Sequence, residues 1–283
     1  MTAAVIDGKA LAQQVRSEVK ERAAGLARAG ITPGLATVLV GEDPASTIYV
    51  SSKQKACAEV GIKVWDYPLP ASTPEDELLA LIADLNANDG VHGILVQLPL
   101  PEHIDEQKVL VAVDPLKDAD GFHPMNLGRL LAGDPVVAPA TPAGIQEMLI
   151  RSGVEISGAE VVVVGRSNIV GKPIAAMLMQ KAPGANATVT ICHTRTRDIA
   201  EHTVRADILI AAIGRAHAIT APMIKKGAVV IDVGMNRTED GLKGDVDFEA
   251  AKEICSQITP VPGGVGPMTI AMLLSNTVKL AGG

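Results

Sequence analysis

The sequence contains few aromatic residues and few cysteines. Of its 283 residues, one is tryptophan, two are tyrosine and two are phenylalanine. The hydrophobic residues make up 47% of the chain, so they are mainly aliphatic and numerous enough for a sizeable core. The three cysteines, Cys57, Cys192 and Cys255, are far apart and form no C-x-x-C pair. This spacing predicts no disulfide framework.

Several kinds of segment are also missing from the sequence. No apolar run approaches the roughly 18 residues that a membrane-spanning helix needs. The N-terminus, MTAAVIDGKALAQQV, has an acid at Asp7 and no basic start, so we expect no secretory signal. The net charge is −7, and no basic stripe is present, which argues against nucleic-acid and membrane partners. The six histidines show no metal-ligand spacing, so we expect no metal site. The cysteines imply no disulfides and the sequence shows no secretory signal, so we expect a cytoplasmic, reduced compartment.

Apolar runs typical of strands alternate with helical patterns along the chain. In the first half, strands are predicted at 35–40, 63–69 and 93–101, and a helix begins at Ser72-Thr73-Pro74. In the second half, a helix is predicted from Thr141-Pro142 to about Ser152. Strands follow at AEVVVVG (159–165), 187–192, 207–214 and 227–234.

This alternation predicts two α/β domains with parallel sheets. We place the first at 1–140 and the second at 141–269, with a C-terminal helix at 270–283.

The segment VVVVGRSNIVGKP (161–173) has the parts of a phosphate-binding turn. A buried strand ends at Gly165, and a helix begins near Lys172 after a second glycine, Gly171. Backbone N–H groups at the start of a helix favour a phosphate, and Ser167 can add a hydroxyl donor. Because Ser167 replaces the middle glycine of G-x-G-x-x-G, the glycine spacing is a weak signal. An ordinary turn between a strand and a helix is the alternative.

The end of the next strand bears on the choice of dinucleotide. An NAD-specific fold usually places an acid there to hold the ribose diol. Here the sequence is Cys192-His193-Thr194-Arg195-Thr196-Arg197. Hydroxyl and guanidinium groups suit a 2′-phosphate, and Arg166 can join them, which favours NADP over NAD. A solvated basic loop is the alternative interpretation.

The first half contains four weaker candidate residues. Tyr49 and Lys53 are four residues apart in a helical pattern, so they project from the same face of the helix. The alternative interpretation is a tyrosine at the edge of the core and a lysine on the surface. Gln97 is a polar residue at the end of a buried strand. Asp120 in KDADGF fits a site or a plain Asp-Gly turn. In the second half, PVPGGVGPMT predicts a rigid loop that another molecule can approach closely, or a simple connection.

Together these segments resemble a known family over nearly the whole chain. The family is the bifunctional methylenetetrahydrofolate dehydrogenase/methenyltetrahydrofolate cyclohydrolases. The resemblance rests on five segments, YVSSKQKACAEVGI, EDELLALIADLNANDGVHGILVQLPLP, KDADGFHPMNLGRL, VVGRSNIVGKP and PGGVGPMT. It implies an N-terminal three-layer α/β catalytic domain that binds folate, onto which the C-terminal helix packs back. It also implies a Rossmann-like NADP-binding domain, with a cleft between the two.

The resemblance implies two reactions, oxidation of 5,10-methylenetetrahydrofolate by NADP⁺ and hydrolysis of the methenyl product to 10-formyltetrahydrofolate. Lys53 matches the lysine of the hydrolytic step, and a lysine beside a cation should have a lowered pKa. Tyr49 matches a tyrosine that stacks on folate. Gln97 would hold Lys53 or the folate, and Asp120 would accept N–H bonds from the pterin ring.

The remaining implied contacts divide between the two ligands. The folate side would be lined by Pro262, Gly263 and Gly264. The cofactor would be held by Gly165, Arg166, Ser167, Thr194 and Met235. A homodimer is also implied. A dehydrogenase without hydrolase activity and a non-catalytic dinucleotide sensor are the competing hypotheses.

Overall fold

The computed structural model describes residues 2–41 and 53–283. Its contacts divide the chain into two compact units. Unit 1 comprises Met1–Ala12 and Thr141–Thr269, and unit 2 comprises Gln13–Ala140 and Ile270–Gly283. The predicted first domain, 1–140, differs from unit 2 at its start. The reason is strand β1 (Ala4–Val5), which pairs in parallel with β11 (Gln257–Ile258) and so extends the sheet of unit 1.

Unit 2 is built on a three-stranded parallel sheet in the order β3-β2-β4. The strands are β2 (Gly34–Val40), β3 (Lys63–Leu69) and β4 (Gly93–Val96), close to the predicted ranges. The helices are the larger part of α1 (Gly8–Arg28), residues 53–60, α3 (Glu75–Ala87), α4 (Glu106–Ala112), α5 (Pro124–Ala132) and most of α10 (Val265–Leu280).

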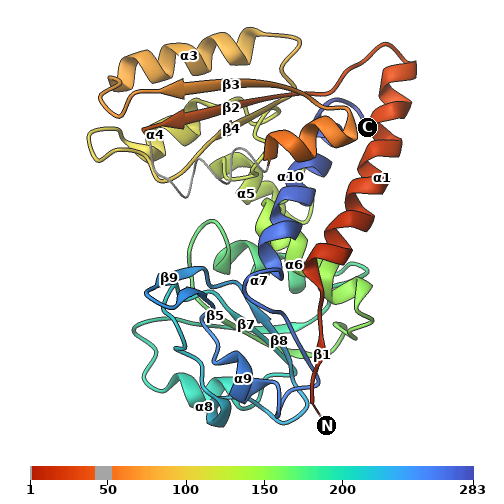
Figure 1. Cartoon of the computed structure of the whole chain (residues 1–283), viewed down its shortest axis with the longest axis vertical. Coiled ribbons are helices and arrows are strands. Elements are labelled where there is room, and N and C mark those ends of the chain that lie inside the picture. Colours follow the sequence, from red (N-terminus) through yellow and green to blue (C-terminus); the bar gives the residue numbers. More distant parts are fainter. Residues whose placement is uncertain (1, 42–52) are drawn as a thin grey trace. The chain divides into compact units, whose positions relative to one another are not determined.

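Alternation along the strands of unit 2 creates two buried faces. On one face, Val38 and Ile94 pack with Ile82 of α3 and Val109 of α4 in a single apolar cluster, and Figure 1 shows α3 along the sheet. On the other face, Thr277 of α10 lies against Gly93, where an added Cβ would be 3.4 Å from its hydroxyl. Helices therefore cover both faces, which is the predicted three-layer arrangement.

Two predicted helix starts differ from the structure. The residue before α3 is Pro74, and no side chain caps this helix; the Thr73 hydroxyl donates instead to the Pro70 carbonyl at 2.7 Å. Helix α6 (Ala140–Arg151) begins one residue before Thr141, whose hydroxyl contacts that of Thr269 at 2.9 Å. In both cases another oxygen competes for the hydroxyl, and the pattern of residues alone does not reveal that partner.

Unit 1 is built on a six-stranded sheet in the order β1-β11-β8-β7-β5-β6, in which every pairing is parallel. The other strands of this sheet are β5 (Glu160–Val164), β6 (Thr188–Cys192), β7 (Ile208–Ala211) and β8 (Val229–Asp232). The helices are α6, α7 (Gly171–Leu178), α8 (Ile199–Thr203), the short 3-10 helix η1 (Ala221–Met223) and α9 (Phe248–Ala251). A hairpin of β9 (Asn236–Thr238) and β10 (Gly241–Lys243) follows β8.

The sheet of unit 1 is covered on both faces. Val162 and Leu209 belong to a buried cluster that includes Ala251 of α9, with Ile199 of α8 packed against it. The alternating residues, such as Val161 and Val163, point to the opposite face, where Figure 1 shows α6 and α7. The predicted fold class, a two-domain α/β protein with parallel sheets, is confirmed.

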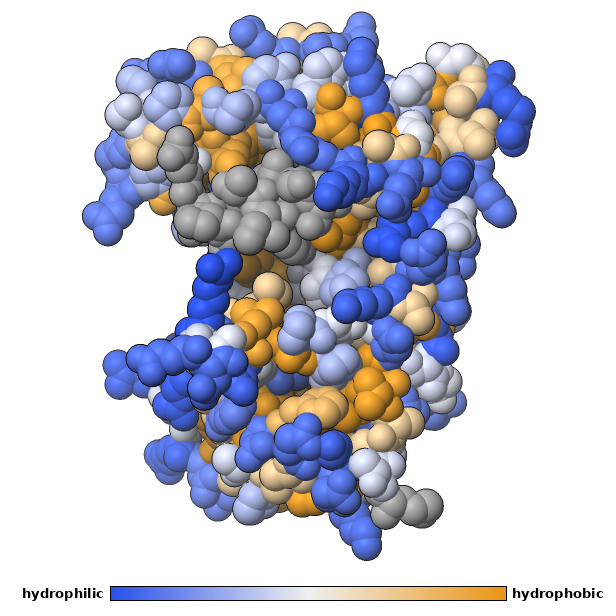
Figure 2. Space-filling model, viewed as in Figure 1, coloured by the Kyte–Doolittle hydropathy of each residue, from blue (hydrophilic) through white to orange (hydrophobic). Residues whose placement is uncertain are grey.

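The surface of each unit is mixed in character. Figure 2 shows hydrophobic residues as small groups separated by hydrophilic ones. Among residues 2–41 and 53–283, no helix combines the length and the apolar character needed to cross a membrane. Within the same ranges, no cluster of three or more histidine, cysteine or acidic side chains is arranged to hold a metal ion.

Candidate functional site

The carboxyl end of β4 in unit 2 brings three predicted residues together. Lys53 lies in the helical stretch 53–60, and its ammonium group donates to the Gln97 side-chain carbonyl oxygen at 3.0 Å. Gln97 follows β4 directly and donates its amide to the Leu98 carbonyl at 2.8 Å. Asp120 lies near enough for its charge to act on Lys53. Tyr49 lies outside the described residues.

The electrostatics of this cluster suit proton transfer. Lys53 is only 4% exposed, so the surface-lysine interpretation is wrong. Burial lowers the pKa of Lys53, while the charge of Asp120 acts in the opposite direction. Burial raises the pKa of Asp120 to about 6, although Lys53 partly offsets this effect. Burial, rather than the neighbouring cation expected from the sequence, is the main cause of the lysine's lowered pKa.

The loop that carries Asp120 is fixed by residues that the sequence analysis missed. Asp118 is buried, and its carboxylate accepts from the backbone N–H groups of Gly121 at 3.0 Å and His123 at 2.8 Å. From α10, Asn276 donates its amide to the carbonyls of Ala119 and Ala138, both at 2.9 Å. Asp118 precedes Asp120 by two residues in KDADGF, and this spacing was the only sequence signal for its role.

The turn after β5 in unit 1 has the close backbone packing of a phosphate-binding turn. Gly165 has φ +140°, and a Cβ there would lie 2.1 Å from the Ala212 carbonyl oxygen. A Cβ on Gly171 would lie 2.2 Å from the carbonyl oxygen of Gly165, so both positions require glycine. The Ser167 hydroxyl accepts from the N–H groups of Val170 at 3.1 Å and Gly171 at 3.4 Å. A hydroxyl that accepts two bonds still has its own hydrogen to donate.

The loops after β5 and β6 are neighbours. Val164 is paired with Cys192, and the N–H of Gly165 donates to the Cys192 carbonyl at 2.8 Å. Arg166 and Thr194 each lie two residues beyond this pair, and both are exposed. The structure therefore brings together the two segments that were assigned to phosphate binding.

The segment PVPGGVGPMT (260–269) and Met235 also belong to unit 1. The glycines of this segment pass close to Gly8, at which a Cβ would lie 1.9 Å from the Gly264 carbonyl oxygen. Gly263 has φ +106°, a conformation that favours glycine, and Pro262 is exposed. Met235 follows β8 and is 58% exposed.

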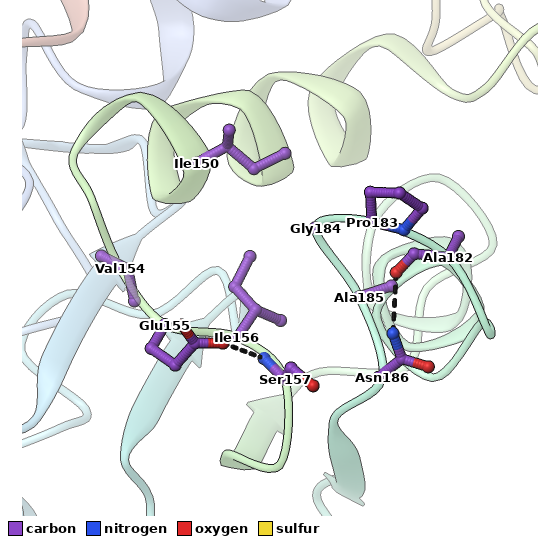
Figure 3. Close-up of a pocket in the computed structure, with 10 residues that line it drawn as sticks. All are labelled: Ile150, Val154, Glu155, Ile156, Ser157, Ala182, Pro183, Gly184, Ala185 and Asn186. Carbon is purple, nitrogen blue, oxygen red and sulfur yellow. Dashed lines mark hydrogen bonds between the residues drawn. The ribbon is translucent and has the colours of Figure 1, made fainter.

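A separate hollow of about 270 Å³ lies in unit 1 and contains none of the predicted site residues. Figure 3 shows Ile150 of α6 above it, with Val154 on one side and Pro183 on the other. Its loops, 154–157 and 182–186, precede β5 and β6, so the hollow lies by the amino ends of these strands. In open parallel sheets, ligands bind at the opposite, carboxyl ends.

The parallel sheet and its glycine turn define the class of dinucleotide-binding α/β proteins. The sequence model of the tetrahydrofolate dehydrogenase/cyclohydrolase catalytic domain matches residues 6–120, and that of the NAD(P)-binding domain of the same family matches residues 139–282. The chain belongs to the tetrahydrofolate dehydrogenase/cyclohydrolase family, as the sequence resemblance predicted.

Similar proteins span the same length. A bifunctional protein FolD of Magnetococcus marinus is 61% identical, with 97% of this chain and 96% of that protein covered. The crystal structure of a bifunctional FolD methylenetetrahydrofolate dehydrogenase/cyclohydrolase from Campylobacter jejuni is 48% identical, covers 99% of both chains and has a TM-score of 0.94. The Trypanosoma brucei enzyme, complexed with NADP and an inhibitor, is 40% identical, covers 100% of this chain and 98% of its own, and has a TM-score of 0.93.

Proposed function

We propose that the protein is a bifunctional enzyme of one-carbon folate metabolism. It oxidises 5,10-methylenetetrahydrofolate to 5,10-methenyltetrahydrofolate with NADP⁺ and then hydrolyses the product to 10-formyltetrahydrofolate. Family membership over both domains supports the reaction pair. The observation that carries the hydrolytic step is the buried Lys53 ammonium group bonded to Gln97 beside Asp120.

The residues of unit 1 fit an NADP cofactor. The backbone of Gly165 and Gly171 leaves no room for side chains, so a phosphate can approach the start of α7. The exposed side chains of Arg166 and Thr194 supply the charge and the hydroxyl for a 2′-phosphate. When bound, NADP supplies a nicotinamide ring that accepts a hydride. The NADP complex of the Trypanosoma brucei enzyme supports this choice of cofactor.

The oxidation makes small chemical demands on the protein. A C–H bond of the methylene carbon breaks and its electron pair leaves as hydride, so the substrate becomes a methenyl cation. The lone pairs of the two flanking nitrogens stabilise this cation. The protein therefore has mainly to position the substrate, a task that we assign to Tyr49, Asp120 and the loop Pro262, Gly263 and Gly264.

The hydrolysis needs acid–base catalysis. The oxygen of water forms a bond to the methenyl carbon and loses both of its protons in turn, so that it becomes the formyl oxygen. The bond from this carbon to N5 breaks, and N5 takes up one proton. The formyl group remains on N10, and one proton is released overall. We assign the proton transfers to Lys53, because burial lowers its pKa and so favours the neutral amine that can accept a proton. Gln97 holds the amine in place through its 3.0 Å hydrogen bond.

One experiment separates this function from its alternatives. The purified protein is mixed with methylenetetrahydrofolate and NADP⁺, and absorbance is followed for NADPH and for the methenyl compound. The bifunctional enzyme forms NADPH without lasting accumulation of the methenyl compound. With a dehydrogenase that lacks hydrolase activity, the methenyl compound accumulates, because it is removed only by its slow spontaneous hydrolysis. A dinucleotide sensor forms no NADPH, and that result would refute the proposed function.

We further propose a homodimer in the cytoplasm. The sequence resemblance implies the homodimer, and the cysteine content supports a reducing compartment, because Cys57, Cys192 and Cys255 are all buried and free. Sedimentation equilibrium tests the dimer, and a monomer mass at micromolar concentration would refute it.

A further inference from the structure

Asp245, a fully buried acid in unit 1, holds the loop after β7. Its Oδ2 accepts from the backbone N–H groups of Ile213 at 2.5 Å and Gly214 at 2.9 Å. Its Oδ1 accepts from the N–H of Arg215 at 3.0 Å and from the side-chain amide of Asn236 at 2.9 Å. Four donors thus converge on one carboxylate, and they come from the segments that follow β7 and β8.

A second buried acid, Asp232, holds the first in place. It ends β8, is 3% exposed and accepts from the N–H groups of Gly234, Asp245 and Val246, all at 2.9 Å. The chain is shaped to admit both carboxylates. A Cβ on Gly234 would lie 2.4 Å from Oδ1 of Asp245, and a Cβ on Gly244 would lie 1.9 Å from Oδ2 of Asp232.

The position of these loops in the sheet indicates what they serve. In doubly wound sheets a dinucleotide lies across the carboxyl ends of the strands, with its two halves on opposite sides of the central turn. The order β8-β7-β5-β6 places the phosphate turn after β5 and the adenosine-binding loop after β6. The loops after β7 and β8 therefore face the other, nicotinamide half. Met235 lies between Gly234 and Asn236, which the two acids hold.

We propose that Asp245 and Asp232 are positioning residues that fix the backbone beneath the nicotinamide half of the dinucleotide. This inference rests on the proposed NADP-dependent function. The carboxylate oxygens already accept bonds from the chain itself, so the pair acts through the loops and does not bind a ligand directly. Such fixed loops hold the ring in one orientation toward the substrate, which hydride transfer requires.

Asp245→Asn tests the inference with almost no change of shape. In either orientation of the new amide, its NH₂ group faces two N–H donors, so two of the four bonds are lost. Binding is measured by calorimetry with NADP⁺ and with adenosine 2′,5′-bisphosphate, which carries only the adenosine half and the 2′-phosphate. We expect the Kd for NADP⁺ to rise by about tenfold or more, and that for the bisphosphate to change by less than about twofold.

Two further variants complete the design. Asn236→Ala removes one donor and keeps both acids, so it allows the same comparison of the two Kd values if Asp245→Asn does not fold. We expect the Kd for NADP⁺ to rise about threefold and the Kd for the bisphosphate to stay unchanged. The control, Asp247→Asn, lies two residues from Asp245 and weakens only the cap of α9, where its carboxylate accepts from Ala250 N–H. Its two Kd values should keep the wild-type ratio.

The possible results are distinguishable. If Asp245→Asn and Asn236→Ala raise the Kd values for both ligands equally, or change neither Kd, the positioning role is refuted while the proposed function stands. If the wild-type protein binds NADP⁺ no better than the bisphosphate, the nicotinamide half adds nothing to binding and the inference also fails. If the wild-type protein binds neither ligand, the proposed function itself is overturned, and the inference with it.

Discussion

Replacing Lys53 by methionine should separate the two proposed activities. Methionine has a similar volume and no proton to transfer, so the substitution removes acid–base catalysis while it keeps the packing. General acid–base catalysis contributes about 10²–10⁴-fold to a rate, so we expect hydrolysis of the methenyl compound to fall at least about 100-fold. Hydride transfer needs no proton from Lys53, and we expect it to fall by less than about tenfold.

The structure also bounds the effect of this substitution on folding. The Gln97 carbonyl oxygen loses its 3.0 Å bond to the ammonium group, and an unsatisfied buried acceptor costs about 1–3 kcal/mol. Methionine offsets part of this cost, because position 53 is only 4% exposed and the wild-type amine is desolvated there, a penalty that an apolar side chain does not carry. The variant should therefore fold, and circular dichroism with thermal unfolding checks this directly.

The assay follows NADPH and the methenyl compound together in one reaction. With Lys53→Met, the methenyl compound should accumulate as NADPH forms. Lys55→Met is the matched control, because Lys55 lies in the same helical stretch and is exposed; both activities should stay within about twofold of the wild type. Hydrolysis by Lys53→Met at a near wild-type rate would show that the lysine is not the acid–base group.

Three further predictions concern the two ligand sites. Because the pKa of Asp120 is raised to about 6, its carboxylate is charged above that pH and neutral below it, so the KM for the folate should rise as the pH falls through about 6; a flat KM profile would contradict the acceptor role. Asn276→Ala leaves the buried Ala119 carbonyl and the part-buried Ala138 carbonyl without this donor and should cost about 1–3 kcal/mol, seen as a lower Tm, and an unchanged Tm would contradict this. The double variant Arg166→Ala, Thr194→Ala should raise the KM for NADP⁺ more than that for NAD⁺, and equal effects would remove the argument for a 2′-phosphate.

The sequence predicts the sheets well, and the reason is physical. Strands buried on both faces are near-continuous runs of Val, Ile and Leu, so the predicted ranges 35–40 and 159–165 nearly match β2 and β5. By contrast, β1 has only two residues, both exposed, and its pairing with β11 joins segments about 250 residues apart. A local pattern carries no information about such a distant partner.

The candidate site was predicted less evenly. The resemblance identified Lys53, Gln97 and Asp120. Without it, the pattern around Lys53 favoured a surface lysine, and Asp120 also fitted a plain Asp-Gly turn, while Gln97 was a candidate from its place at the end of a strand. Asp232 and Asp245 were missed, because an acid at the end of a strand or just after it reads as the start of a loop. The signal that was available is the pair of glycines, Gly234 and Gly244, each placed where a Cβ would collide with one of the acids.

The pairing of β1 with β11 also constrains how the polypeptide folds during its synthesis on the ribosome. Unit 1 draws on residues before Gln13 and after Ala140, and unit 2 draws on Ile270–Gly283. Neither sheet-and-helix assembly is therefore complete until the final stretch of the chain has been translated, and domain-by-domain folding from the N-terminus is not available to it. An emerging chain must keep its early hydrophobic segments from aggregating for longer than a chain with two consecutive domains. For the same reason, a protein divided after Ala140 would yield two fragments that each lack part of their own scaffold.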